Sequence, residues 1–336
     1  MDMITWLEEL KKETNKKPMP ILSFPSVNLM GITVRELTES SEAQATGMAL
    51  IAEKYGTLAS VSMMDLSLEA EAFGASVRYS DDEVPTVVGA LITTQEEANA
   101  LEVPPITSGR LSRSVETIRL AKEKITDRPV FAGVIGPFSL AGRLMDITEA
   151  MIKCYDEPDM VHTTLEKASD LLINYINAFK AVGANGVVMA EPLAGMLSPM
   201  LAEEFSEPYV KKIVNAVQDE SFIVIYHNCG DNVKLMTESI LRTGAAAYHF
   251  GNSVKMSEML EKIPTDTVVM GNVDPAGQIR NGTPESVKAA TLEILTACDK
   301  YNNFVISSGC DIPPASSFEN IDAFFEAVNE FYENRD

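Results

Sequence analysis

The residues best suited to chemistry are a histidine and two cysteines that end two separate apolar segments. His227 and Cys229 lie two positions apart at the end of one segment, and Cys310 lies at the end of a later one. On a β-strand, two residues at this spacing point to the same face. One imidazole and two thiols make a ligand set that suits zinc and leaves its fourth position open. The pattern therefore predicts a catalytic zinc site at His227, Cys229 and Cys310.

The spacing of these three residues does not by itself exclude a structural role, because buried cysteines and histidines are common core residues. The other two cysteines, Cys154 and Cys298, fall in helical stretches, and we expect them in the core. Four cysteines in 336 residues do not form a disulfide framework. This cysteine content favours a reducing compartment, and we expect a cytoplasmic protein.

The segments that carry these residues belong to a regular alternation of short apolar runs and long helical patterns. Most of the runs are continuously apolar, which is typical of strands buried on both faces of a parallel sheet. Eight strands are predicted, at 20–27, 57–63, 128–136, 184–192, 221–230, 245–253, 266–274 and 303–311. Eight strands with intervening helices predict an α/β fold of the (β/α)8 TIM-barrel type, in which the carboxyl ends of all strands open on one rim.

The main rival is a doubly wound open sheet. No glycine-rich phosphate-binding motif follows the first predicted strand, which weakens the nucleotide-binding versions of that fold. Residues 1–19 are predicted to form an added N-terminal helix, and residues 75–128 an insertion with a hairpin and a helix after Ser112. No linker or repeat divides the chain, so residues 1–336 are interpreted as a single domain.

Composition excludes several classes of partner. The chain has 49 acidic against 27 basic residues and a net charge of −22. Nucleic acids and anionic lipid surfaces attract basic proteins, so neither is an expected partner. No apolar stretch reaches the roughly 18 residues of a membrane span. The N-terminus also lacks the apolar region of a signal peptide.

With these motifs together, the chain resembles the methylcobamide:coenzyme M methyltransferases, which are corrinoid-dependent enzymes of the uroporphyrinogen decarboxylase superfamily. The resemblance spans most of the chain, and the His-x-Cys…Cys pattern is its specific part. Less specific motifs begin at Met64 (MDL), Glu69 (EAEAFG), Gly136 (GPFSLA), Ala190 (AEP), Gly271 (GNVDP) and Gly309 (GCDIP).

The resemblance implies a barrel of the uroporphyrinogen decarboxylase type and a zinc-dependent methyl transfer. His227, Cys229 and Cys310 would hold Zn²⁺, and a small-molecule thiol such as coenzyme M would bind it as a thiolate. The methyl donor would be a methylcobamide, a methylated corrinoid carried by a separate corrinoid protein that docks over the barrel mouth.

Two carboxylates are predicted as catalytic residues. Glu191 ends the fourth predicted strand, where a carboxylate is typical of a site residue or of an acceptor for the ligand His227. Asp65 matches the central acid of the decarboxylases, with a helix N-cap as the alternative. Arg143 could receive an anionic group of the acceptor. His249 is a candidate fourth ligand, although a hydrogen bond within the core is the simpler role.

Other functions stay open at this point. A uroporphyrinogen decarboxylase-like enzyme would need no metal, and only Arg35 is available in the N-terminal segment, where the decarboxylases place several arginines. A zinc methyltransferase could use another donor or acceptor, such as a methylated folate or homocysteine. A protein that stores or delivers zinc or corrinoid is disfavoured, because storage sites usually have closed coordination.

Overall fold

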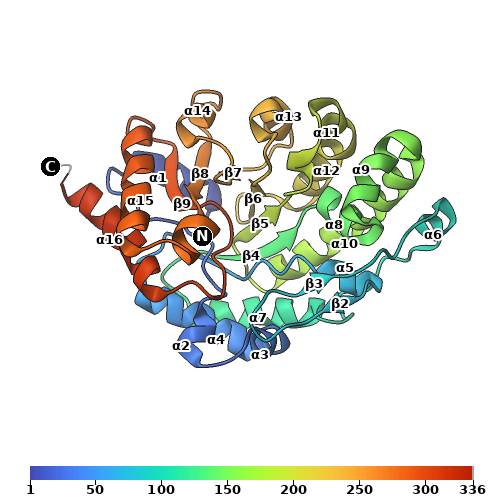
Figure 1. The fold of residues 1–336 in the computed structure, drawn as a ribbon, viewed down its shortest axis with the longest axis horizontal. Coiled ribbons are helices and arrows are strands. Elements are labelled where there is room, and N and C mark those ends of the chain that lie inside the picture. Colours follow the sequence, from blue (N-terminus) through green and yellow to red (C-terminus); the bar gives the residue numbers. More distant parts are fainter. Residues whose placement is uncertain (335–336) are drawn as a thin grey trace.

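The fold is a curled parallel sheet surrounded by helices, seen in a computed structural model that describes residues 1–334 (Figure 1). Seven strands form the sheet in the order β1-β4-β5-β6-β7-β8-β9, so neighbours in the chain are neighbours in space. They are β1 (Ser60–Val61), β4 (Val130–Ile135), β5 (Gly186–Ala190), β6 (Ile223–Asn228), β7 (Ala247–Phe250), β8 (Val268–Val273) and β9 (Phe304–Ser308). The predicted α/β barrel architecture is confirmed.

The first predicted strand, 20–27, is wrong: this segment contains no sheet strand, and its end forms α2 (Ser26–Met30). The residues just before it nevertheless take the eighth position in the ring. Met19 N donates to Ile306 O on β9 at 3.0 Å, and Leu58 N donates to Pro18 O at 2.9 Å, beside β1. Prolines at 18 and 20 have no N–H, so this segment lacks the donors of a regular ladder on its β1 side.

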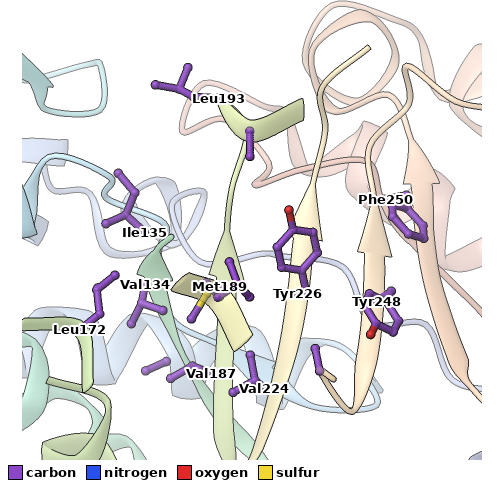
Figure 2. Packing of buried hydrophobic residues seen from close by; sticks show 14 of the residues in the cluster. Val134, Ile135, Leu172, Val187, Met189, Leu193, Val224, Tyr226, Tyr248 and Phe250 are labelled. Carbon is purple, nitrogen blue, oxygen red and sulfur yellow. The ribbon is translucent and has the colours of Figure 1, made fainter. Parts of the chain in front are cut away.

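Helices cover the outside of the sheet, and a large apolar layer fills the space between them. Figure 2 shows part of this layer on β4–β7. The helices with eight or more residues are α1 (Met3–Lys12), α4 (Ser41–Lys54), α7 (Leu111–Lys124), α8 (Pro137–Met145), α9 (Ile147–Asp156), α10 (Pro158–Ala181), α12 (Glu207–Val217), α15 (Pro284–Cys298) and α16 (Phe318–Glu333). No helix among residues 1–334 is long and apolar enough to cross a membrane.

Shorter helical segments join these elements. They are α2, α3 (Val34–Glu39), α5 (Leu68–Phe73), α6 (Gln95–Ala100), η1 (Ala194–Met196), α11 (Pro199–Phe205), η2 (Val233–Leu235), α13 (Thr237–Arg242), α14 (Met256–Leu260) and η3 (Pro275–Arg280). Within 75–128 the chain forms an antiparallel pair, β2 (Val77–Arg78) with β3 (Thr86–Val87), followed by α6 and α7.

Helix α1, at the start of residues 1–19, closes one end of the barrel. Its buried face packs against inward residues near the amino ends of the strands, which we call the base. The Trp6 and Phe131 rings have centroids 5.9 Å apart, and Met3 N donates to Glu220 O at 2.7 Å. The opposite end, at the carboxyl ends of the strands, is called the mouth.

Candidate metal centre

The three predicted ligands meet at the mouth. His227 is on β6, Cys229 follows that strand directly, and Cys310 follows β9 by two residues. Successive strand residues alternate between faces, so β6 turns Ile223, Ile225 and His227 inward. One ligand atom from each of His227, Cys229 and Cys310 lies within 4.8 Å of the others. The fold therefore brings Cys310 to the His227–Cys229 pair, although 81 positions separate Cys310 from Cys229 in the sequence.

The donor atoms of this cluster fit a zinc ion. His227 is fully buried, yet its Nε2 has no hydrogen-bond partner among the described residues. A buried nitrogen without a partner is costly, and a metal bound to Nε2 would remove that cost. One imidazole nitrogen and two sulfurs are also the ligand types that zinc prefers. The site thus has three protein donors, which is the number typical of catalytic zinc.

The two cysteines share a local environment that favours one thiolate. Each sulfur is within hydrogen-bond reach of the other, so the thiol of Cys310 stabilises a thiolate on Cys229. This contact lowers the pKa of Cys229 and raises the pKa of Cys310 to about 12. A Cβ at position 251 would lie 2.3 Å from Cys229 Cβ, so Gly251 leaves the space that this ligand occupies.

His249 lies behind the ligand cluster. Its Nδ1 is 2.8 Å from His227 Nδ1, and its Nε2 is 2.7 Å from Ser307 Oγ. Both ring nitrogens are therefore used in hydrogen bonds. This supports a hydrogen-bonding role in the core for His249 and not that of a fourth zinc ligand. Burial and the neighbouring His227 hold the pKa of His249 well below its usual range, so its ring is neutral.

Glu191, which directly follows β5, faces the N-terminus of α8. Its Oε1 accepts from Phe138 N at 2.7 Å, and its Oε2 accepts from Ser139 N at 3.0 Å and Ser139 Oγ at 2.7 Å. A Cβ at Gly136 would lie 2.1 Å from Glu191 Cγ, so a larger residue at this position of the Gly-Pro-Phe motif would clash with Glu191.

The idea that Glu191 accepts a hydrogen bond from the ring of His227 is wrong, because His249 takes that position. Burial raises the pKa of Glu191 to about 7. A catalytic role for Glu191 stays a prediction.

Asp65 is also engaged elsewhere. Its Oδ2 is paired with Arg110, and its Oδ1 accepts from Ser67 Oγ at 2.6 Å. Arg110 Nε is in turn 2.6 Å from Glu71 Oε2. Two carboxylates therefore pair with one buried guanidinium. The metal cluster does not include Asp65, and its predicted catalytic role stays a prediction.

Glu69 is a buried acid that the sequence analysis did not single out. Its Oε1 accepts from Ile135 N at 3.1 Å, while its Oε2 has no partner among residues 1–334. Burial raises the pKa of Glu69 to about 7. The sequence gives little indication of this contact, because the backbone N–H that Glu69 accepts from is 66 positions away.

Arg143 lines a small cavity at the mouth. The cavity measures about 230 Å³ and lies between the segment that follows β1 and the second strand of the insertion hairpin, β3. Its lining residues are Met64, Leu66, Ser67, Val84, Pro85, Thr86, Val87 and Arg143. Burial lowers the pKa of the guanidinium. In the part of the chain that the structure describes, no carboxylate forms an ion pair with Arg143, so this positive charge is uncompensated.

A comparison with family models matches most of the chain. The model described as uroporphyrinogen decarboxylase (URO-D) matches residues 24–331. This range includes all three candidate ligands and the His249 side chain behind them.

Curated relatives of two kinds are similar to the chain. The methylcobamide:CoM methyltransferase MtbA of Methanosarcina mazei is 25% identical over 342 residues, which cover 96% of this chain and 97% of that protein. A uroporphyrinogen decarboxylase of Coxiella burnetii is 27% identical over 286 residues, covering 81% and 77%. The predicted resemblance to the methylcobamide:coenzyme M methyltransferases is confirmed.

Solved structures share the fold. A methyltransferase from Methanosarcina mazei superimposes with a TM-score of 0.85 over 98% of each chain, at 23% identity. A B12-independent methionine synthase from Shewanella superimposes with a TM-score of 0.61 over 96% of each chain, at 14% identity. With the family model matched over residues 24–331, the chain belongs to the uroporphyrinogen decarboxylase family.

Proposed function

We propose that the chain is a zinc-dependent methyltransferase that moves a methyl group from a methylated corrinoid, held on a separate corrinoid protein, to a small thiol such as coenzyme M. The observation that carries this proposal is the convergence of His227, Cys229 and Cys310 within 4.8 Å at the mouth. A decarboxylase of this family would have no use for two thiols and an imidazole there. The 25% identity to MtbA over nearly the whole chain supports the same activity.

His227 Nε2 and the sulfurs of Cys229 and Cys310 would hold the zinc. When bound, zinc would act as a Lewis acid that lowers the pKa of the acceptor thiol, while two cysteine thiolates offset its charge and keep the acceptor sulfur nucleophilic. A reducing compartment such as the cytoplasm would keep both cysteines available as ligands.

Arg143 is proposed to bind the anionic end of the acceptor. Its guanidinium is uncompensated and lines the cavity next to Met64, whose backbone N–H donates to Asp311 Oδ2 at 2.8 Å. Asp311 directly follows the ligand Cys310, so Met64 connects the lining of the cavity to the segment that carries this ligand. A thiol with a sulfonate or carboxylate tail would place its charge beside Arg143 and its sulfur toward the ligands.

The test is an assay of the purified protein with methylcobalamin and a panel of thiols, combined with metal analysis. We expect about one zinc per chain, with two sulfur neighbours by X-ray absorption, and methylation of at least one anionic thiol. Decarboxylation of uroporphyrinogen by metal-free protein would contradict the proposal. Methylation only from a methylated folate would assign a different donor.

A further inference from the structure

We propose that His249 and Ser307 are positioning residues that fix the ring tautomer of His227, so that its Nε2 always presents a lone pair to the metal. This inference rests on the proposed zinc site. The three side chains form a relay, His227–His249–Ser307, which ends on the backbone carbonyl of Met19. Their residues are fully or almost fully buried, with exposed fractions of 0%, 2% and 0%.

The direction of each hydrogen bond in the relay follows from its last member. The Met19 carbonyl can only accept, so the hydroxyl hydrogen of Ser307 is used in the 2.7 Å bond to Met19 O. Ser307 Oγ must then accept from His249 Nε2, which is 2.7 Å away. A neutral His249 with its hydrogen on Nε2 has a lone pair on Nδ1. His249 Nδ1 therefore accepts from His227 Nδ1 at 2.8 Å.

A second contact leads independently to the same tautomer of His227. The backbone carbonyl of His249 is 3.2 Å from His227 Nδ1, and a carbonyl has no hydrogen to give. His227 must therefore carry its hydrogen on Nδ1, which leaves Nε2 free as a lone pair. This is the atom without a partner in the cluster with Cys229 and Cys310.

The choice of a histidine as the acceptor behind His227 suits the charge of the site. Ligand histidines usually donate to a carboxylate, a carbonyl or water. A carboxylate here would place a further negative charge behind a centre that already has two thiolate ligands. Neutral His249 accepts the same hydrogen bond without that charge. The constraint then passes to Ser307, which lies on β9 close before Cys310.

The relay can be tested without metal by nitrogen NMR of protein labelled with ¹⁵N-histidine. The chain has three histidines, so the spectrum contains three rings, and His162→Gln assigns the one outside the relay. We expect the metal-free wild type to show His227 protonated on Nδ1 and His249 protonated on Nε2. A His227 ring protonated on Nε2 would overturn the proposal, whether or not the protein binds zinc.

A matched pair of variants tests the effect on metal binding. Ser307→Ala removes the relay acceptor, whereas Ser308→Ala removes the neighbouring buried hydroxyl, which accepts from Ile21 N at 3.0 Å but lies outside the relay. In competition with a chromophoric chelator, we expect Ser307→Ala to bind zinc about 10- to 100-fold more weakly than the wild type. Ser308→Ala should match the wild type, and Ser307→Thr should restore binding.

Equal zinc affinity for Ser307→Ala and Ser308→Ala would contradict the relay. If Ser307→Ala does not fold, the tautomers of the wild type decide the question alone. A wild type that binds no zinc would refute the proposed function, while the tautomer measurement on the same protein would still test the relay.

Discussion

The base and the mouth of the barrel are built from the same strands, but apolar side chains line the base and metal-binding side chains line the mouth. On β6, the inward positions change from Ile223 and Ile225 to His227 within two residues, and Cys229 continues the series. At the base, α1 seals the interior with Trp6 and its neighbours. A single strand therefore lines the apolar core at one end and supplies a candidate metal ligand at the other.

The sharpest test of this division is Cys310→Ala at the mouth. We expect methyl transfer to fall by at least about a thousandfold, the scale for a group on which the reaction depends. The metal-free variant should lose less than about 2 kcal/mol in its free energy of unfolding, because the barrel interior carries most of the stability. Urea unfolding of chelator-treated protein measures this value. An unfolded variant would indicate a structural metal and break the comparison.

The complementary change at the base is Trp6→Ala. Loss of this large buried ring, which contacts Phe131, should lower the free energy of unfolding by about 3–5 kcal/mol. Zinc per folded chain should stay at the wild-type level, since α1 contributes no ligand. Ile4→Ala on the exposed side of the same helix is the control, with 43% of its surface exposed. A selective loss of zinc in Trp6→Ala would show that the two ends are coupled.

Glu69 tests whether a buried acid on the mouth side affects the free energy of unfolding. Its raised pKa means that the folded state disfavours the ionised acid. Stability is therefore full below the ordinary glutamate pKa of about 4.5, falls as the pH rises toward about 7, and levels off above that value. We expect the wild type to lose on the order of 2 kcal/mol between pH 5 and pH 8 from this group.

Glu69→Gln should reduce this pH dependence, as measured by urea unfolding at both pH values. The exposed Glu96→Gln serves as the control and should retain the wild-type slope. An unchanged slope in Glu69→Gln would show that Glu69 is ionised in the folded protein at neutral pH.

The smallest expected effect is on the acceptor. Arg143→Met should raise KM for an anionic thiol about tenfold, equivalent to about 1.4 kcal/mol, because it removes the uncompensated guanidinium. kcat should change little, and KM for a neutral thiol such as 2-mercaptoethanol should be unaffected. Equal changes for both thiols would mean that Arg143 shapes the mouth but does not select the acceptor.

Features contained within a single strand were predicted best from the sequence. Continuous apolar runs predicted the strands from β4 to β9, and His-x-Cys at the end of one run predicted the ligands. The prediction of a strand at 20–27 was wrong. It rested on the apolar residues around Ile21, whereas Pro18 and Pro20 lack the N–H groups that a regular strand needs. Proline at alternate positions is a local feature that disfavours a regular strand on that side.

Contacts between side chains far apart in the sequence could not be predicted from the sequence alone. Arg110 neutralises Asp65 from 45 positions away, and nothing near either residue indicates the other. His249 and Ser307 share the inward parity of their strands, but their contact depends on the curl of the sheet. One of the two roles predicted for Glu191 was to accept a hydrogen bond from His227, whereas its carboxylate accepts from Phe138 N at the start of α8.

The backbone hydrogen bond between Met19 and Ile306 closes the ring by joining its first segment to its last strand, β9. Ribosomes build proteins from the amino end, so β9 and Cys310 emerge after every other strand of the sheet. A nascent chain that has made His227 and Cys229 still lacks the third ligand, the hydroxyl of Ser307 and the partner of Met19. Completion of the proposed zinc site would consequently wait for the emergence of β9, and it would report that the ring has closed.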